Sequence, residues 1–143
     1  MKPILFVTIA FFLVTSFSCK EEKTPVDGRI FYDTDRFVMG ADLSYANQIL
    51  DVGGVYRDSG AIKNPYLIFS QYGTNVVRLR LWHNPVWTSE LYPGQEMGIY
   101  NGLDDVKIAI SESKKFGMKV CLDFHYSDNW ADPSKQVVPA AWE

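Results

Sequence analysis

The sequence predicts an α/β fold of the (β/α)8 TIM-barrel type, of which only about the first three β/α units are present. Strand and helix signals alternate as β-α-β-α-β, with strand starts about forty residues apart. The expected strands also carry charged side chains on one face, toward their carboxyl ends. In a barrel the outward face packs on helices, whereas the inward face can be charged at the top, where active sites lie.

The first half of this pattern contains a strand, a helix and a second strand. Residues 37 to 42 form a short apolar run that ends in a charge, which is typical of a strand. Asn64 and Pro65 indicate a helix start, because Asn caps a helix and Pro is tolerated in its first turn, and Gly73 marks the helix end. Residues 75 to 82 alternate apolar and charged side chains, which predicts the second strand.

The second half contains a helix and a third strand. A helix is expected over residues 103 to 116, and Gly117 ends it. The face of this helix that we expect to be buried carries Leu103, Val106, Ile110 and Ser113. Residues 119 to 124 predict the third strand, in which Cys121 is expected to be a buried small hydrophobe.

Side-chain alternation decides between the barrel and an open, doubly wound sheet. The apolar faces of the second and third strands carry Val77, Leu79, Leu81, Val120, Leu122 and Phe124. The opposite faces carry Arg78, Arg80, Cys121, Asp123 and His125, and Asp42 ends the first strand in the same way. In an open sheet two arginines on one strand would be hard to bury between helices. The first strand also lacks the glycine-rich turn of a nucleotide binder, so the pattern favours the barrel.

The amino-terminal residues predict export. Lys2 gives a positive start, residues 4 to 17 are almost uninterruptedly apolar, and small Ser18 precedes Cys19. This order resembles a bacterial lipoprotein signal, in which Cys19 is lipidated and becomes the mature amino terminus. A simple secretory signal with a chance cysteine is the alternative interpretation.

The chain is therefore interpreted as three segments. Residues 1–19 are the lipoprotein signal peptide ending at the lipobox cysteine, residues 20–35 are a polar tether, and residues 36–143 are the N-terminal part of a barrel. The charged run at residues 20–23 resembles the tag of Bacteroidetes-type surface lipoproteins. We therefore expect an exported outer-membrane or cell-surface lipoprotein of a Gram-negative, Bacteroidetes-like bacterium. Because a complete barrel requires about 250 residues, we also expect the sequence to belong to a longer protein.

Composition excludes several kinds of partner. The net charge of −3 gives no basic footprint for nucleic acid. With only two cysteines, neither a disulfide framework nor a cysteine metal cluster is available. The two histidines end different strands, and Asp128 and Asp132 lack the spacing of a calcium loop. No metal site is therefore predicted in these residues.

The stretch DFHYSDNWADP, residues 123 to 133, gathers three carboxylates, an imidazole and two polar aromatic rings. Three interpretations compete, namely an ordinary polar loop, a metal site, or one wall of a ligand cleft. The tryptophans favour the cleft, because all four fall at strand ends or in the loops that follow, where a barrel builds its site: Trp82, Trp87, Trp130 and Trp142.

A series of motifs supports a specific kind of cleft. They are VMGADLSY at 38–45, GGVY at 53–56, VRLRLWHNP at 77–85, GMKV at 117–120, LDFHYSD at 122–128, WADP at 130–133, KQ at 135–136 and PAAW at 139–142. In this order and near this spacing they resemble the arabinogalactan endo-β-1,4-galactanases, glycoside hydrolase family 53. The resemblance runs from about residue 37 to the last residue, and the loop ending in WADP is highly specific to that family.

The resemblance implies a retaining glycosidase whose acid/base and nucleophile are glutamates at the ends of strands four and seven. Retention requires two carboxyl groups about 5–5.5 Å apart. The resemblance places both glutamates beyond residue 143, so no catalytic residue is assigned in this chain and the 143-residue fragment is predicted to be inactive.

The resemblance also assigns roles within the chain. Arg78 matches the arginine that bonds and orients the nucleophile's carboxylate, a task that suits a bidentate guanidinium. His125 matches a histidine that lines the cleft near the catalytic subsite. The same substrate-binding wall is expected to include Asp42, Arg80, Asp123, Asp128 and Trp130. Sugars have polar edges and flat apolar faces, so carboxylates and indoles close together suit a galactan cleft.

The implied partner is β-1,4-galactan or type I arabinogalactan, with a membrane contacted only through a lipid anchor at Cys19. No cofactor is implied, although a structural calcium in the part beyond residue 143 stays open. Two alternatives remain: a surface glycan-binding lipoprotein on a TIM-barrel scaffold, and a same-clan β-glycanase such as a mannanase.

Overall fold

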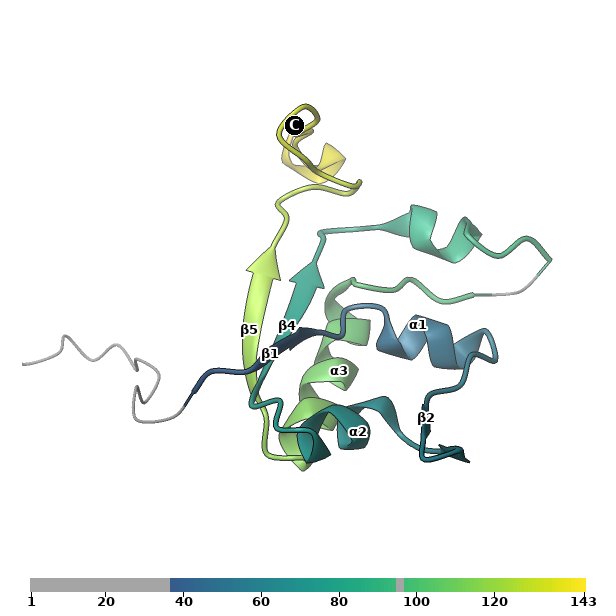
Figure 1. The fold of residues 1–143 in the computed structure, drawn as a ribbon. Coiled ribbons are helices and arrows are strands. Elements are labelled where there is room, and N and C mark those ends of the chain that lie inside the picture. The colour runs from purple at the N-terminus through teal and green to yellow at the C-terminus, as the bar shows by residue number, and fades with distance from the viewer. Residues whose placement is uncertain (1–36, 95–96) are drawn as a thin grey trace, which may run out of the picture. The chain divides into compact units, whose positions relative to one another are not determined.

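The structure, a computed structural model, describes residues 37–94 and 97–143. In these residues three parallel strands form one sheet in the order β1 (Gly40–Asp42), β4 (Val76–Leu81) and β5 (Lys119–Phe124) (Figure 1). The predicted alternation and parallel pairing are therefore confirmed. The predicted signal peptide with Cys19 and the tether at residues 20–35 lie outside the described residues.

The helices between these strands lie where the sequence places them. α2 (Pro65–Gln71) connects β1 to β4, and α3 (Leu103–Lys115) connects β4 to β5. The sequence patterns do not indicate the remaining short elements, which are α1 (Ala46–Asp51), the antiparallel strands β2 (Arg57–Asp58) and β3 (Ala61–Ile62), and the 3-10 turns η1 (Val86–Glu90) and η2 (Ala140–Trp142). In the part of the chain that the structure describes, no helix has the length and apolar character needed to cross a membrane.

The start and end of α2 follow from its capping residues. The side-chain oxygen of Asn64 accepts hydrogen bonds from the backbone N–H groups of Tyr66 at 2.8 Å and Leu67 at 3.4 Å. Pro65 occupies the first turn, where no backbone donor is needed. After the last turn Gly73 adopts a φ of +94°, which costs glycine little and lets the chain turn toward β4.

The first turn of α3 is held by Asp105. Its Oδ2 accepts from the backbone N–H of Asn101 at 2.7 Å, and its Oδ1 accepts from Nδ2 of Asn47 at 2.7 Å. Because Asn47 belongs to α1, this carboxylate ties α3 to α1. Burial raises the pKa of Asp105, and the hydrogen bonds from Asn47 and Asn101 offset only part of that rise.

The buried face of α3 differs in part from the predicted one. Val106, Ala109 and Ser113 are buried and Ile110 is partly buried, but Leu103 is 58% exposed. The prediction for Leu103 is therefore wrong. Leu103 is the first residue of the helix, and it lies at the carboxyl edge of the sheet, beyond the core cluster.

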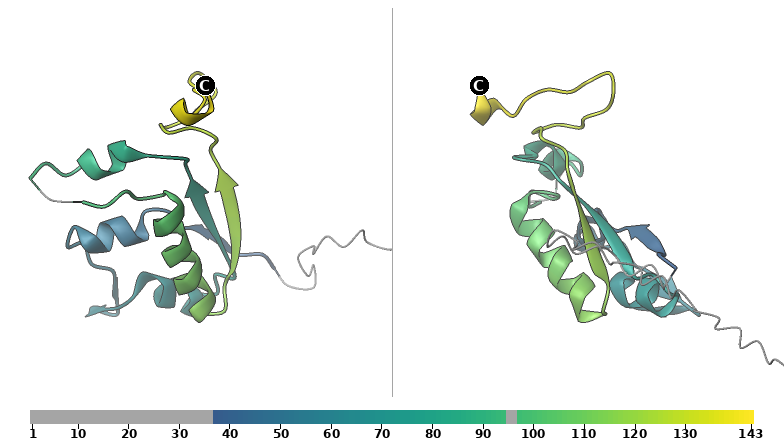
Figure 2. Two further views of the ribbon diagram at one scale, coloured as in Figure 1. Left: turned by 180° about the vertical axis from the view of Figure 1, so that it is seen from behind. Right: turned by 90° about the vertical axis from the view of Figure 1, so that its left-hand side faces the viewer.

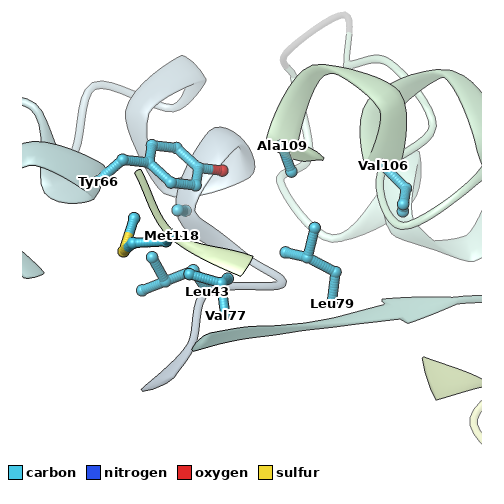
Figure 3. Close-up of a cluster of buried hydrophobic side chains, with 8 residues drawn as sticks. Leu43, Tyr66, Val77, Leu79, Val106, Ala109 and Met118 are labelled. Carbon is cyan, nitrogen blue, oxygen red and sulfur yellow. The ribbon is translucent and has the colours of Figure 1, made fainter. Parts of the chain in front are cut away.

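The core lies between the apolar face of the sheet and the helices. Figure 3 shows Leu79 of β4 facing Val106 and Ala109 of α3, with Tyr66 of α2 over the other end of the cluster. The full cluster consists of Leu43, Ala46, Tyr66, Val77, Leu79, Val106, Ala109 and Met118. Figure 2 shows α3 lying along the sheet, as burial of one sheet face requires.

The opposite face of the sheet carries the polar and charged side chains. Cys121 is exposed on that face, so its predicted burial is wrong. The physical reason is alternation, which places Cys121 on the same side of β5 as Asp123 and His125 and away from the core.

Replacing Leu79 by alanine should lower the free energy of unfolding by about 3 kcal/mol, because truncation of a core side chain leaves a cavity. The matched change Leu103→Ala should cost less than about 0.5 kcal/mol, because that side chain is mostly in water. Urea denaturation followed by far-UV circular dichroism measures both. Equal losses in the two variants would contradict the assignment of the buried face.

Candidate functional site

The carboxyl ends of the three strands bring four charged side chains together. The register of the sheet pairs Asp42 of β1 with Arg78 of β4, and Arg80 of β4 with Asp123 of β5. Because side chains alternate across a strand, Arg78, Arg80 and Asp123 lie on the sheet face opposite the core. Asp42 ends β1 and bonds to both arginines. The structure thus gathers these four predicted site residues into one row.

Asp42 is held by hydrogen bonds on both carboxylate oxygens. Oδ1 accepts from the hydroxyl and the backbone N–H of Ser44, the latter at 3.1 Å, and Oδ2 accepts from Nη1 of Arg78 and from Nη2 of Arg80 at 2.9 Å. Burial alone would raise the pKa of Asp42, but the bonds from Ser44 and the two guanidinium groups outweigh it and keep the pKa below its ordinary value. Asp42 is therefore an anion at neutral pH and no proton donor.

Arg78 bridges the two outer strands of the sheet. Its Nη1 donates to Asp42 of β1 and its Nη2 donates to Asp123 of β5. Oδ2 of Asp123 also accepts from Nε2 of His125 at 3.1 Å. The result is a charge row of alternating partners across the carboxyl edge, which runs Arg80, Asp42, Arg78, Asp123 and His125. A guanidinium has more N–H donors than these two bonds use, so Arg78 retains donors to offer a ligand.

An aromatic surface adjoins the charge row. The ring of Trp82 lies 4.7 Å from that of His125 and 5.9 Å from that of Trp130, measured between centroids. Trp82 is buried, whereas Trp130 is 47% exposed. The guanidinium carbon of Arg80 lies 5.5 Å from the ring centre of Tyr45 and 5.4 Å from that of Trp130. Arg80 therefore connects the charges to an indole that is open to solvent.

Asp128 lies apart from the charge row, in the loop after β5. Its carboxylate accepts from Nδ1 of His83 at 3.0 Å and from the backbone N–H groups of Asn84 and Ala140, both at 2.9 Å. The bond from Ala140, followed by those from His83 and Asn84, keeps the pKa of Asp128 below its ordinary value. All three donors are protein groups. His83 and Asn84 come from the segment after β4, and Ala140 comes from the start of η2.

A hollow of about 580 Å³ opens beside the end of β5. It is lined by Asp123 and His125 from the charge row and by the loop that follows, including Asp132 and Gln136. This volume is in the usual range for small-molecule sites, about 300–1,000 Å³. A ligand in the hollow would therefore meet the end of the charge row.

This arrangement can bind and orient a polar ligand with flat apolar faces. It does not contain a free acid–base pair, because Arg78 engages both carboxylates of the row, Asp42 and Asp123. Over residues 37–94 and 97–143, no three or more His, Cys, Asp or Glu side chains are grouped so that they could hold a metal ion.

Two residues that shape the site were not singled out from the sequence. The hydroxyl and the backbone N–H of Ser44 both donate to Asp42. The spacing of these two residues in the sequence could have indicated the contact, because a residue two positions after an aspartate often donates to its carboxylate. Tyr45 stacks on Arg80 across 35 residues of sequence. No local pattern indicates that contact.

Comparison with known proteins identifies the family. The family model described as glycosyl hydrolase family 53 matches residues 38–143 of the chain. The chain belongs to glycosyl hydrolase family 53. An arabinogalactan endo-β-1,4-galactanase from Cellvibrio japonicus is 44% identical over 110 residues, which are 77% of this chain and 27% of that protein. An endo-β-1,4-galactanase from Bacillus subtilis is 40% identical over 110 residues, which are 74% of this chain and 24% of that protein.

Solved structures of the family share the fold. The family 53 catalytic domain from Ignisphaera aggregans matches with a TM-score of 0.63 and 36% identity over 83% of this chain and 31% of that one. A fungal β-1,4-galactanase structure matches with a TM-score of 0.61 and 33% identity over 73% of this chain and 28% of that one. The three-stranded sheet is therefore part of a (β/α)8 barrel, as predicted. This family 53 chain spans about a quarter of the length of the curated relatives that it matches.

Asp42 and Asp105 should make the free energy of unfolding depend on pH in opposite directions. The folded pKa of Asp42 lies below the ordinary 3.8, so its contribution is present above pH 3.8 and is lost as the pH falls through the folded pKa. The folded pKa of Asp105 lies above 3.8, so its contribution is present below pH 3.8 and is lost as the pH rises through the folded pKa.

Asparagine variants separate the two effects. Asp42→Asn should flatten the acid limb of the stability profile, and Asp105→Asn should flatten the decline above pH 3.8. Urea midpoints measured between about pH 2 and 6 give both profiles. If the two variants altered the same limb, the opposite pKa shifts would be refuted.

Proposed function

We propose that the protein to which this chain belongs is an endo-acting, retaining glycoside hydrolase that cleaves β-1,4-galactosidic bonds of pectic galactan or arabinogalactan. The main structural support is the charge row at the carboxyl ends of the strands, which Arg80 joins to the exposed indole of Trp130. Family membership and the names of the relatives, which are galactanases, support the same activity.

Arg78 is proposed to orient a catalytic carboxylate. It is fixed from two sides by Asp42 and Asp123, and its side chain remains 42% exposed on the charged face. A guanidinium in a fixed position offers parallel N–H donors that match both oxygens of a carboxylate and favour its ionised form. A nucleophile must be ionised and must face the anomeric carbon, and Arg78 serves both needs.

The carboxyl groups that cut the bond are proposed to be two glutamates that are not among residues 1–143. A retaining mechanism needs one carboxylate as nucleophile and one carboxylic acid as proton donor, about 5–5.5 Å apart. Asp42 and Asp123 are poor candidates for that pair, because Asp42 is kept ionised and Asp123 is already engaged by Arg78 and His125, which leaves no free proton donor. Residues 20–143 alone are therefore expected to release no sugar from galactan.

The substrate is proposed to lie along the aromatic surface. A galactosyl unit has one flat apolar face, which can stack on the exposed indole of Trp130, and hydroxyl groups that can bond Asp123 and His125 at the edge of the hollow. The proposed contacts of Asp42 and Arg80 are indirect, because each is already engaged by the other and by its neighbours.

Arg78→Ala in the full-length protein should lower kcat on galactan at least about a hundredfold, because misplacing the nucleophile slows the chemical step by about that factor. Arg78→Lys should not restore it, because a point charge lacks the fork geometry. Arg57→Ala is the matched control, since Arg57 lies in the β2–β3 hairpin, where it bonds the carbonyl of Gly60. Reducing-sugar release measures all three.

Assays of glycan cleavage and glycan binding by the wild-type full-length protein distinguish the competing functions. Release of short galacto-oligosaccharides from galactan supports the proposal. Cleavage of another β-glycan such as mannan, with galactan left intact, would replace the substrate. Tight binding of galactan without any cleavage would indicate a surface glycan-binding protein instead.

We also propose that the protein is exported and held at the outer membrane or cell surface by a lipid on Cys19. The support is the sequence alone, namely the apolar run that ends in Ser18 and Cys19, followed by the charged residues 20–23. An anchored hydrolase at the surface would act on a polymer too large to enter the cell.

Replacing Cys19 by serine should abolish incorporation of radiolabelled palmitate and move the protein from the membrane fraction to the soluble or secreted fraction. Cys121→Ser is the matched control and should change neither result, because Cys121 belongs to β5. Unchanged labelling of the Cys19→Ser protein would refute the anchor.

A further inference from the structure

Asp128 joins three separate segments of the chain. His83 and Asn84, in the segment after β4, donate to its Oδ1 at 3.0 and 2.9 Å, and the backbone N–H of Ala140 donates to its Oδ2 at 2.9 Å. The backbone carbonyl of Asp128 accepts from Nε1 of Trp87 at 3.1 Å. Four donors thus converge on one residue of the loop that follows β5.

The residue before Asp128 extends this connection. Ser127 is buried, and its carbonyl accepts from the backbone N–H of His83 at 3.0 Å. Its hydroxyl accepts from the backbone N–H of Asn129 at 3.2 Å. The joined segments lie beyond the carboxyl ends of β4 and β5 (Figure 1). The loop is therefore held at Ser127 as well as at Asp128, beyond the carboxyl ends of β4 and β5.

All four tryptophans of the chain lie in the segments that Asp128 joins. Trp82 and Trp87 follow β4, and their ring centroids are 5.7 Å apart. Trp130 lies two residues after Asp128, with its ring 5.9 Å from that of Trp82. Trp142 ends η2 and lies 5.3 Å from the ring of His83. Moving any one segment would change the spacing of these rings.

We propose that Asp128 is a positioning residue, which sets the spacing of the exposed indoles of Trp130 and Trp142 for successive sugar units without touching the sugar itself. The sugar ligand in this statement rests on the proposed function. Protein donors already occupy both oxygens of the carboxylate, which leaves little acceptor capacity for a sugar hydroxyl. Trp130 and Trp142 are 47% and 54% exposed, so both have surface to offer.

The geometry requires a carboxylate at this position. Donors approach both oxygens of Asp128, and an asparagine has one acceptor oxygen while its amide nitrogen is itself a donor. In Asp128→Asn the amide would face either the N–H of Ala140 or the donors of His83 and Asn84. One segment would therefore lose its bond, although the side chain keeps its shape.

The first test compares two aspartate-to-asparagine changes in the full-length protein acting on galacto-oligosaccharides. Asp128→Asn should raise KM about tenfold and change kcat less than about threefold, because it disturbs binding surfaces rather than reacting groups. Asp58→Asn is the matched control, because Asp58 also accepts three side-chain bonds, from Ser59, Lys63 and Tyr72 near the hairpin. A fall in kcat at unchanged KM, or no effect on either constant, would overturn the proposal.

A pair of His83 variants tests the same bond without altering Asp128. Asparagine at position 83 can place its amide N–H where Nδ1 lies, whereas leucine cannot donate. His83→Asn should keep KM within about threefold of wild type, and His83→Leu should raise it about tenfold. Both variants lose the ring contact with Trp142, so the difference between their KM values reports the hydrogen bond from residue 83 to Asp128 alone. Equal KM values for the two variants would overturn the proposal, even if Asp128→Asn failed to fold.

A measurement without substrate separates this inference from the proposed function. Acrylamide quenching of tryptophan fluorescence should increase roughly twofold in Asp128→Asn, because released segments expose their rings. It should stay at the wild-type value in Asp58→Asn. If wild type cleaved no galactan, the proposed function would fail, and increased quenching in Asp128→Asn would still support the positioning role. Unchanged quenching would overturn that role whatever the activity.

Discussion

The guanidinium of Arg78 is shared between Asp42 and Asp123, and this single charge connects all three strands of the sheet at their carboxyl ends. Ion pairs as exposed as these contribute no more than about 1 kcal/mol each, so stability is not their main effect. Their effect is geometric. Each carboxylate holds the arginine from one side, and the arginine in turn holds both carboxylates in place at the carboxyl ends of the strands.

Two further connections extend from this row. Arg80 also bonds to Asp42 and lies over the rings of Tyr45 and Trp130, so the charge row is in contact with an exposed indole. Asp128 then holds the loop that carries this indole against the neighbouring segments. In the function proposed above, this arrangement offers the sugar a polar floor and an aromatic wall, and the two glutamates come from other strands of the barrel.

Much of this arrangement could be predicted from the sequence, because it follows from alternation along strands. The apolar positions Val77 and Leu79 and the charged position Arg78 fall on opposite faces in the structure as expected. The errors have local causes: Leu103 begins its helix beyond the core, and Cys121 shares the charged face. The convergence of His83, Asn84 and Ala140 on Asp128 could not be predicted, because it joins segments that only the folded chain brings together.

A crystal structure of the full-length protein with a bound β-1,4-galacto-oligosaccharide would test the role of Arg78 and of the aromatic surface together. We expect the sugar to stack on Trp130 and to reach the edge of the hollow at Asp123 and His125, with the Asp42–Arg78–Asp123 bridge intact. We also expect a glutamate carboxylate within hydrogen-bonding distance of Arg78. A sugar bound away from the carboxyl ends of β4 and β5, or an Arg78 without a glutamate partner from another barrel strand, would refute the proposed roles of Arg78 and Trp130.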